Sequence, residues 1–568
     1  MVRRLFPVET LVFLAVWLGL MIGGRSALFR DPGALWHPVV GSRMLDQGQV
    51  VHADWLSFTR AGEPWVAHGW LAEIGMALLQ RVAGLDGLLL ATATVLAAAY
   101  AMVAARMRRA GMHWLGIWAI VAVTLLAGAP QFHTRPLVVS VLLTVVSFGW
   151  LLDVDTGRRS IRWLWWLVPV VWLWANIHPG VLGGLGTVGL VAAGWLAGYL
   201  LSSSREASDA AREAGAPTDP SAMTAWHGSP IRTRADAAQL LGILLACGAV
   251  LLLNPYGLGL PLAWLETLRL PLPAMIEEHR PLRWASMQGM LVGGVALGYL
   301  ATWLALRRGA TGAPPVPIVG GQPAIGPGTV DSPPLPIRPS HAPHFWLLIV
   351  PLVWFVLAVM RVRAAGLFAA MAAMALVEVL PHTRWAAWLR RCDWLRDPHG
   401  DARLANGAGV SSRIAAVVPL LVVLLTFALQ VADARVPVVG RGWAHLSRAD
   451  WPLELLPTLE GIERQGPPGT PIFNDLAFGG LLIGRTPGLR VFVDDRCALY
   501  GESFLMRYDA ARRERPAKLD RWRTQYGFRH ALVETGGAFD RYLAASEAWR
   551  LIDRTPVASL YVFDEPTR

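Results

Sequence analysis

Long apolar runs are the feature that most constrains this chain. They recur through the first three quarters of the 568 residues, and many end in short loops rich in arginine. About 20 residues of helix cross a bilayer core of about 30 Å, so the chain is predicted to be an α-helical multi-pass membrane protein with about eleven spans. The predicted spans are 6–24, 85–105, 114–130, 137–153, 163–177, 180–201, 237–254, 287–306, 345–360, 364–380 and 414–432. Composition agrees, because 16% of the residues are charged, against about a quarter in soluble proteins.

The distribution of basic residues predicts the orientation. The loops with Arg106, Arg108 and Arg109 and with Arg158 and Arg159 fall on one side, and the loops of the other side hold fewer basic residues. Cytoplasmic loops carry the excess of Lys and Arg, so we expect the N-terminus inside, as an uncleaved anchor, and the C-terminus outside. The net charge of +11 lies largely in short loops beside spans, so it does not indicate a nucleic-acid partner.

Three regions differ from the spans in composition. Residues 202–236 are rich in Ser, Ala and charge, and residues 309–343 are rich in Pro and Gly, so both are predicted to be disordered cytoplasmic insertions. Residues 433–568 carry alternating strand and helix patterns, which predict a small extracytoplasmic α/β domain. The strands are expected at 471–474, 489–494, 530–534 and 560–563, and the helices at 477–485, 517–527 and 538–546. The transmembrane body is then 1–432, with a first external loop at 25–84.

Polar residues collect in the loops predicted to be external. The first loop holds Asp31, His37, Asp54, His68 and Glu73. The later loops contribute Gln131–Pro136, Asn176–Pro179, Asn254–Gly257, Glu277–Arg280 and Arg361–Arg363. The spans have no carboxylate at mid-membrane depth, which argues against an ion-coupled transporter. Acids, histidines and arginines from several loops at one depth predict an extracytoplasmic site at the membrane interface.

These residue types suit transfer from a lipid-linked phosphate donor. Asp31, together with Asp54, could act as the general base or hold a divalent cation, Mg²⁺ or Mn²⁺. Arg135, Arg361 and Arg363 could clamp the phosphate with charge-assisted hydrogen bonds. Each acid also has a structural interpretation. Asp31 and Asp54 suit helix caps, and Glu73 suits the first turn of a helix. Asp494-Asp495-Arg496, after a predicted strand, is interpreted as structural, with acceptor recognition as the alternative.

A set of motifs in fixed order gives the chain a family resemblance. The motifs are Asp31-Pro32, Trp36-His37, Asp54, His68-x-Trp70-Leu71-x-Glu73, Arg135-Pro136, Ala175-Asn176-x-His178, Leu253-Asn254-Pro255-Tyr256-Gly257, and Phe473-Asn474-Asp475 with Gly479-Gly480. In this order the chain resembles the GT-C class of membrane glycosyltransferases, and more narrowly a related group of bacterial multi-pass proteins. The resemblance departs at Gly33 and Gly69, where acids are expected.

The resemblance implies a function and a set of partners. GT-C enzymes use polyprenyl-phosphate sugars and carry an essential acid in the first external loop, which here is Asp31. It adds His37, His68, Glu73, Asn176 and His178 as substrate-binding candidates; each of the three histidines also has a structural interpretation. The predicted protein is a glycosyltransferase of the bacterial inner membrane that moves a sugar to a cell-envelope acceptor on the external face. The alternative is a non-catalytic lipid- or glycan-binding component of envelope polysaccharide assembly or export. Either way, we expect the first-loop acids and the later arginines to share one outward-facing pocket beside the lipid.

Overall fold

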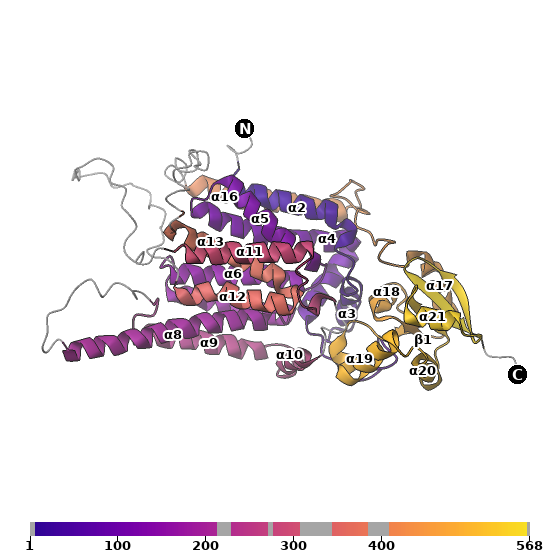
Figure 1. Cartoon of the computed structure of the whole chain (residues 1–568). Coiled ribbons are helices and arrows are strands. Elements are labelled where there is room, and N and C mark those ends of the chain that lie inside the picture. Colours follow the sequence, from indigo (N-terminus) through magenta and orange to yellow (C-terminus); the bar gives the residue numbers. More distant parts are fainter. Residues whose placement is uncertain are drawn as a thin grey trace.

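The chain folds into a long helical bundle with a small sheet domain at one end (Figure 1). The computed structural model describes residues 6–212, 229–270, 277–306, 344–383, 385 and 408–564. Among these, eight helices are long and apolar enough to cross a membrane. They are α2 (Val8–Ala27), α4 (Trp70–Arg109), α5 (Trp114–Gly128) with η1 (Ala129–Gln131), α6 (Leu137–Asp155), α8 (Val181–Arg212), α9 (Arg234–Ala249) with η4 (Val250–Leu252), α11 (Met287–Leu304), and α13 (Ala365–Val379) with η7 (Val362–Ala364).

The other three predicted spans are also helices. They are α7 (Leu167–Ile177) after η2 (Ile161–Trp166), α12 (Phe345–Met360) and α16 (Ala408–Val431). Their apolar stretches are shorter than a full span, at least in the described residues. Every predicted span is therefore a helix, and the α-helical multi-pass fold is confirmed. The physical reason is that a backbone surrounded by lipid must satisfy its hydrogen bonds internally, and a long apolar run does so by forming a helix.

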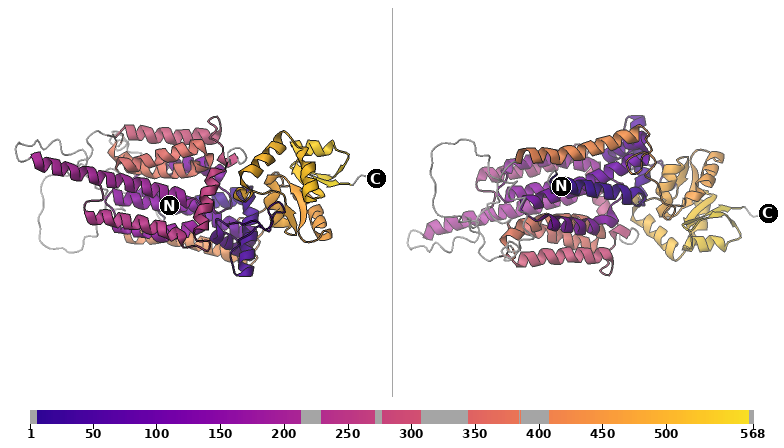
Figure 2. Two further views of the ribbon diagram at one scale, coloured as in Figure 1. Left: turned by 90° about the horizontal axis from the view of Figure 1, so that it is seen from below. Right: turned by 90° about the horizontal axis from the view of Figure 1, so that it is seen from above.

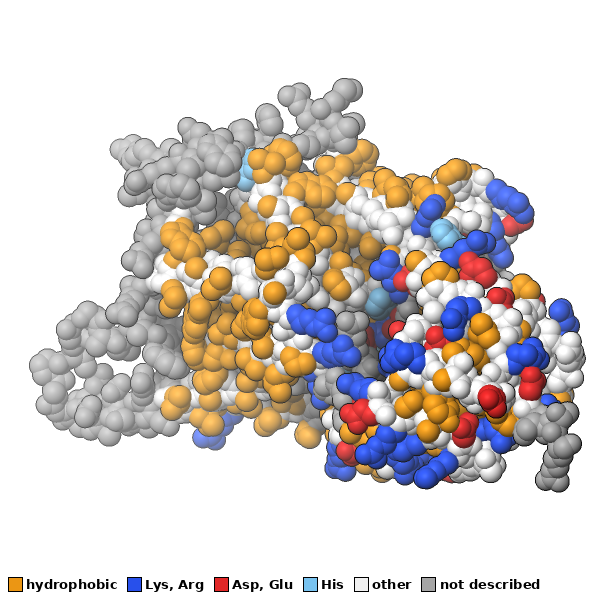
Figure 3. Space-filling view, turned by 45° about the vertical axis from the view of Figure 1, so that its right-hand side comes forward, with side chains coloured by type: hydrophobic (Ala, Val, Ile, Leu, Met, Phe, Trp, Pro, Cys, Tyr) orange, Lys and Arg blue, Asp and Glu red, His pale blue; other side chains and the backbone are white. Residues whose placement is uncertain are grey.

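Close packing and lipid-facing surfaces explain the bundle. Helix α13 is rich in Ala and is buried along most of its length. Its Gly366 approaches Gly128 of α5 so closely that a Cβ on Gly128 would lie 2.9 Å from the Gly366 Cα. Small residues allow such approaches between membrane helices. Large apolar side chains such as Leu245 and Leu297 instead lie on the outer surface, 74% and 70% exposed. Figure 3 shows this apolar surface over the bundle, with charged side chains gathered over the sheet domain.

The loop after α2, predicted to be external, contains an additional helix. Helix α3 (Gly33–Gln47) follows α2, and an irregular stretch then leads to α4. Helix α4 is kinked at Gly84, whose φ of 63° favours glycine. The predicted span at 85–105 thus corresponds to the part of α4 after the kink, and the part before it packs against α3.

The two predicted insertions differ in outcome. Residues 309–343 lie outside the described residues. Of 202–236, residues 202–212 extend α8 and residues 229–236 lead into α9, while the remainder lies outside the described residues. The prediction of disorder is therefore wrong for 202–212. This stretch contains Arg, Glu and Ala, which favour helix and let α8 continue beyond its apolar part.

The C-terminal domain contains one five-stranded sheet of order β2-β1-β3-β5-β4. The strands are β1 (Thr470–Asn474), β2 (Leu489–Val491), β3 (His530–Glu534), β4 (Trp549–Arg554) and β5 (Ala558–Phe563). β1 pairs in parallel with β2 and β3, and β5 pairs antiparallel with β3 and β4. The helices are α17 (Leu456–Gln465), α18 (Gly479–Arg485), α19 (Cys497–Arg513), α20 (Lys518–Tyr526) and α21 (Ala538–Ala544).

Most of these elements are as predicted, but β4, α17 and α19 are not among the predictions. β4 lies at the sheet edge and is largely exposed, so it has no clear apolar alternation. α19 is interrupted by Gly501, with φ of 72°. Both features weaken the periodic signal on which a sequence prediction depends.

Candidate functional site

Both views of Figure 2 show the sheet domain at one end of the bundle. Ion pairs join four connections of the chain at that end. The four connections are residues 28–69 after α2, residues 132–136 before α6, η6 (Glu277–His279) and η7. Charged side chains from all four connections lie in one group. The loops that the sequence predicts to be on one side of the membrane therefore do meet.

Asp31 begins a chain of ion pairs across these connections. Its Oδ2 lies 2.7 Å from Nη1 of Arg135, and Nη2 of Arg135 pairs with Glu278. Nη1 of Arg363 lies 4.0 Å from Oε1 of Glu278 and donates to Nε2 of His279 at 2.6 Å. We call Asp31, Arg135, Glu278, His279 and Arg363 the acid–arginine cluster. It brings the first-loop acid and one of the late arginines together, as the sequence predicts.

The charges of the cluster stabilise one another. Burial alone would raise the pKa of Glu278, but Arg135 and Arg363 outweigh it and lower the pKa to about 2. Asp31 and Glu278 likewise outweigh the effect of burial on Arg135 and raise its pKa. Burial, reinforced by Arg363, lowers the pKa of His279 to about 3. At neutral pH Glu278 and Arg135 are therefore charged, and His279 is neutral.

Several buried polar atoms around the cluster lack a hydrogen-bond partner among the described residues. They are Oε2 of Glu73, Nδ1 of His133, Oγ1 of Thr134, Nε of Arg135 and Nδ1 of His279. Buried polar groups are nearly always hydrogen-bonded, and leaving one unsatisfied costs about 1–3 kcal/mol. Several unsatisfied polar atoms around one charged cluster are expected where a polar ligand or ordered water supplies the missing hydrogen bonds.

Arg361 lies beside the cluster without joining it. Its charge acts on both His279 and Arg363. Its guanidinium makes no hydrogen bond or ion pair with any side chain in the part of the chain that is described, and it is half-buried. Arg361 is therefore a cation available to a ligand, whereas Arg135 and Arg363 are already engaged.

His37 of the first loop and His178 of the α7–α8 connection are held in fixed orientations by hydrogen bonds. Nδ1 of His37 lies 2.9 Å from Oε1 of Glu73, which is buried. Nδ1 of His178 lies 2.9 Å from Ser140 Oγ and accepts from the Gly180 N–H. Burial, followed by Arg363 and Arg135, lowers the pKa of His178 well below its usual range. Glu73 therefore orients His37 besides occupying the first turn of α4.

Two motif positions hold the loops together. Oδ1 of Asn176 accepts from the Trp70 indole at 2.8 Å, and its amide nitrogen donates to the Trp172 carbonyl at 2.8 Å. A Cβ on Gly69 would lie 2.6 Å from the Ile177 carbonyl oxygen, so a glutamate there would collide with the end of α7. The neighbouring His68 is held neutral, because burial lowers its pKa to about 4. The departure at Gly69 is thus explained by close packing.

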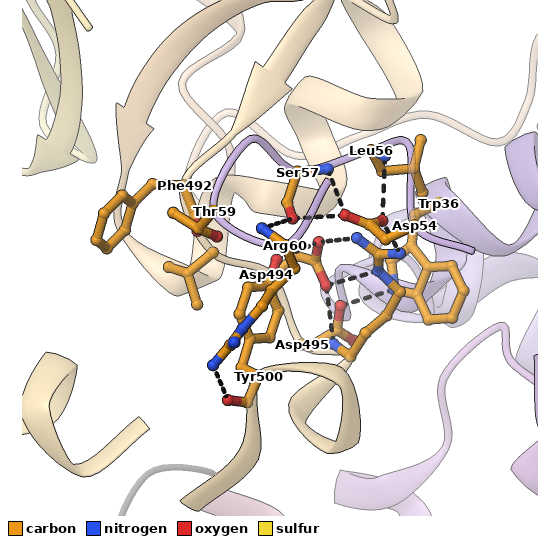
Figure 4. A network of polar contacts seen from close by, with 12 residues as sticks. Trp36, Asp54, Leu56, Ser57, Thr59, Arg60, Phe492, Asp494, Asp495 and Tyr500 are labelled. Carbon is orange, nitrogen blue, oxygen red and sulfur yellow. Dashed lines mark hydrogen bonds and ion pairs between the residues drawn. The ribbon is translucent and has the colours of Figure 1, made fainter. Parts of the chain in front are cut away.

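Asp54 belongs to a second network, between the first loop and the sheet domain (Figure 4). Its Oδ2 accepts from the Ser57 hydroxyl at 2.6 Å, and its Oδ1 accepts from Nη1 of Arg496 at 2.6 Å. Arg496 also makes a bidentate pair with Asp494, to which the Tyr500 hydroxyl donates at 2.9 Å. The side chains of Asp54 and Asp494 are 0% exposed and that of Arg496 is 2% exposed. The expected pairing of Asp54 with Asp31 is therefore not formed, because both Asp54 oxygens are engaged elsewhere.

Asp495, next to that network, faces the acid–arginine cluster. Its Oδ1 accepts from the Trp36 indole at 2.7 Å, and its Oδ2 has no hydrogen-bond partner among the described residues. Burial, followed by the charges of Asp31 and Asp494, raises the pKa of Asp495 to about 8. The Asp495 carboxyl group is thus largely protonated at neutral pH, next to Asp31. The sequence analysis interpreted Asp495 as structural and did not predict that it faces the acid–arginine cluster. The only sequence signal was a pair of acids directly after a predicted strand.

The glycines of the sheet domain make this approach possible. A Cβ on Gly480 would lie 2.4 Å from the Pro32 carbonyl oxygen, and one on Gly479 would lie 2.6 Å from the Val493 carbonyl oxygen. Helix α18 therefore packs directly on the turn that carries Asp31. The Gly479-Gly480 motif places Asp495 near the first loop.

The residues do not fit the expected divalent cation at Asp31 and Asp54. Asp54 is occupied by Ser57 and Arg496, and Oδ1 of Asp31 accepts from the Gly33 N–H at 2.8 Å. In the described ranges no group of three or more His, Cys, Asp or Glu side chains is arranged to hold a metal ion. A side chain at Gly33 would meet Oδ1 of Asp31 at 2.8 Å, so a second acid there would displace the first. Asp495 is the nearby carboxyl group instead.

Comparison with known proteins finds similarity in structure only. No protein-family model matches the chain, and no curated protein matches it either. Among solved structures, the chain is similar to the oligosaccharyltransferase of Archaeoglobus fulgidus tethered with an acceptor peptide. The TM-score is 0.49 at 10% identity, over 93% of this chain and 68% of that one. It is also similar to ArnT from Cupriavidus metallidurans bound to undecaprenyl phosphate, with a TM-score of 0.44 at 14% identity, over 97% of each chain. Both are glycosyltransferases of the GT-C class that the sequence motifs resemble. Likeness at these identities concerns the fold alone.

Proposed function

We propose that this chain is a membrane glycosyltransferase that moves a sugar from a polyprenyl-phosphate donor to a hydroxyl-bearing acceptor of the cell envelope. The observation that carries the proposal is the position of Asp31, in one charge cluster with Arg363 and beside the uncommitted Arg361. A carboxylate for the hydroxyl proton and a cation for the phosphate are the two groups that this transfer needs.

The reaction balances with these groups. The acceptor oxygen forms a bond to the anomeric carbon of the donor sugar, and the bond from that carbon to the phosphate oxygen breaks. The hydroxyl proton passes to the Asp31 carboxylate. The bonding electron pair leaves with the polyprenyl phosphate, whose added negative charge Arg361 stabilises. Electrostatic stabilisation of developing charge is often the largest catalytic contribution.

The donor side of the site lies next to apolar surface. A narrow crevice beside Arg363 is lined by apolar residues of α6 and α13, among them Leu137, Val141 and Leu367. Its free volume is only about 10 Å³, so an isoprenoid tail would lie along it rather than within it. Phosphate at Arg361 with the tail along α6 and α13 is the orientation that this arrangement favours.

We assign Asp495 the role of second carboxyl group and Asp54 a structural role. Because Asp495 is protonated at neutral pH, it can donate a hydrogen bond from Oδ2 to the acceptor or to the phosphate. Asp54 holds Arg496, and through it the Asp494–Asp495 turn. The first loop then contributes the base, and the sheet domain contributes the neighbouring acid.

Asp31→Asn and Arg361→Gln variants test the proposal. In membranes supplied with labelled polyprenyl-phosphate sugars, Asp31→Asn should lower transfer about 10²–10⁴-fold, the range for loss of a general base. Arg361→Gln should weaken binding of undecaprenyl phosphate about tenfold without changing the melting temperature, because Arg361 has no partner in the described protein. Arg435→Gln, at an exposed residue, is the matched control. Full transfer by Asp31→Asn would refute the catalytic role.

The alternative, a non-catalytic component that binds lipid or glycan, makes a different prediction. The same cluster would then bind undecaprenyl phosphate, and Arg361→Gln would weaken that binding. The wild-type protein, however, would transfer no label from any donor. The carboxyl group of Asp31 within the cluster favours the enzyme, because simple phosphate binding does not require an acid there.

A further inference from the structure

A hollow at the opposite end of the bundle from the acid–arginine cluster has no part in the proposed reaction. It lies where α6 ends, beside η2 and the first turns of α9, and its volume is about 650 Å³. A water molecule takes up about 30 Å³, so the hollow has room for roughly twenty. Four arginines line it, namely Arg158, Arg159, Arg162 and Arg232. We call it the arginine hollow.

The arginines on the α6 side belong to a partly buried group of ion pairs with excess positive charge. Arg106, Arg158 and Arg159 share the carboxylates of Asp153 and Glu378. Arg106 lies 2.9 Å from Asp153 and 2.8 Å from Glu378. Arg158 pairs with both acids, and Nε of Arg159 lies 3.4 Å from Asp153. Three guanidinium groups thus share two carboxylates, and two of the three face the hollow.

The acids that line the hollow are already engaged. Asp155 accepts from the Trp195 indole at 2.7 Å and from the His344 N–H at 2.7 Å. Asp236 caps the start of α9 by accepting from the backbone N–H and the hydroxyl of Thr233, both at 2.9 Å. Asp236 also accepts from the backbone N–H of Arg232 at 3.1 Å. Neither carboxylate pairs with a guanidinium group of the hollow in the described structure, so the guanidinium groups of Arg162 and Arg232 are not taken up by these acids.

Two arginines of the hollow are available to a ligand. The guanidinium groups of Arg162 and Arg232 make no hydrogen bond or ion pair with the residues that are described, and both side chains are exposed. They approach from different elements, Arg162 from η2 and Arg232 from the segment before α9. Two free guanidinium groups on opposing elements can hold one phosphate between them.

The surroundings place the hollow at a membrane edge. Trp165 and Trp166 of η2 are 44% and 57% exposed, and tryptophan is enriched at membrane interfaces. Leu200 and Leu201 of α8, exposed apolar side chains at 61% and 53%, lie toward the same end of the bundle. The charge rule predicts this end to be cytoplasmic, and basic pockets between helices on that side suit anionic headgroups.

We propose that the arginine hollow binds a phosphate-bearing anion, and that its occupant is the headgroup of an anionic phospholipid of the cytoplasmic leaflet. The bridging phosphate would lie between Arg162 and Arg232, with Arg159 as a third cation. Because no residue of the acid–arginine cluster takes part, this site stands whether or not the proposed transferase activity does.

Native mass spectrometry of the purified full chain, titrated with phosphatidylglycerol or phosphatidylcholine, tests the proposal. Each arginine near an anionic lipid changes affinity about fivefold, so Arg162→Gln/Arg232→Gln should weaken phosphatidylglycerol binding about 30-fold. Arg269→Gln/Arg435→Gln removes the same charge from exposed residues elsewhere and should leave binding unchanged. The guanidinium groups of all four arginines make no hydrogen bond or ion pair with the described residues. Neither double variant should therefore change the melting temperature.

A parallel titration with inorganic phosphate distinguishes the two sources of the anion. If millimolar phosphate does not displace phosphatidylglycerol, the occupant is a lipid headgroup. If phosphate displaces it from the wild type, the hollow is an anion site open to soluble phosphate compounds, and the proposed chemistry still holds. Equal affinity for the two lipids, or equal phosphatidylglycerol binding by the wild type and the Arg162/Arg232 variant, would overturn the proposal.

Discussion

Arg496→Met is the substitution whose consequence the structure determines most closely. Arg496 is the only cation paired with Asp54 and Asp494 in the described structure, and all three side chains are at most 2% exposed. Removing one partner of a buried ion pair costs about 3–5 kcal/mol, because the remaining charge is left uncompensated. Here two carboxylates are left, so we expect a loss at the upper end of that range.

Hydrogen exchange of the strand amides measures the loss of stability in the sheet domain itself. A single free energy of unfolding for the whole protein would not, because a multi-domain membrane protein does not unfold in a two-state transition. Peptides over β1, β2 and β3 should exchange faster in Arg496→Met by a factor that corresponds to about 3–5 kcal/mol. The defect should shrink as the pH falls, because the uncompensated carboxylates then take up protons. The triple variant Asp54→Asn/Asp494→Asn/Arg496→Met should recover much of the stability.

Arg550→Met is the matched control in the same domain. Arg550 pairs with Asp564 at 2.7 Å, but the two side chains are 63% and 50% exposed. Such surface pairs contribute about 0–1 kcal/mol. If Arg496→Met and Arg550→Met speed exchange equally, the buried network does not hold the domain as inferred.

Two further substitutions test the contact between the sheet domain and the first loop. Asp495→Asn should stabilise the protein by roughly 2–4 kcal/mol at pH 8, because a pKa raised from 3.8 to about 8 makes the charged group destabilising there. The gain in melting temperature should vanish as the pH falls toward 4, and a gain independent of pH would contradict the assignment. Gly480→Ala should lower the melting temperature by an amount that corresponds to about 1–3 kcal/mol, because its Cβ would lie 2.4 Å from the Pro32 oxygen. Gly461→Ala is the control and should not lower the melting temperature, because nothing lies within 4 Å of its Cβ. Equal effects of the two substitutions would mean that α18 can shift away from Pro32.

The sequence predicts the bundle well because the bilayer restricts the outcome. Apolar runs must become helices, so all eleven predicted spans are helices, including the α4 segment that begins at the Gly84 kink, and eight of them are long enough to cross a membrane. Where local signal is weak the prediction fails. The exposed edge strand β4 lacks alternation, α19 contains Gly501, and residues 202–212 have polar composition but continue a helix.

The site is only partly predictable, because its partners are distant in sequence. The meeting of Asp31 with Arg135 and Arg363 follows from topology, since loops on one face converge. The partner of Asp54 is Arg496, 442 positions away, and no local pattern identifies it. The position of Asp495 near Asp31 cannot be predicted from a local pattern either, because it depends on the close approach of Gly480 to Pro32.

The hydrogen bonds between the two ends of the chain have a consequence for biosynthesis. The Trp443 indole donates to the Met21 carbonyl, the Trp451 indole donates to the Phe29 carbonyl, and Arg30 pairs with Asp450, each joining residues at least 420 positions apart. A ribosome adding about 5–20 residues per second needs roughly 20–80 s to make the intervening chain. The segment that carries Asp31 therefore waits in the nascent protein for these partners until the chain beyond α16 has emerged. A product terminated before that point keeps the Asp31–Arg135 ion pair but lacks these three contacts.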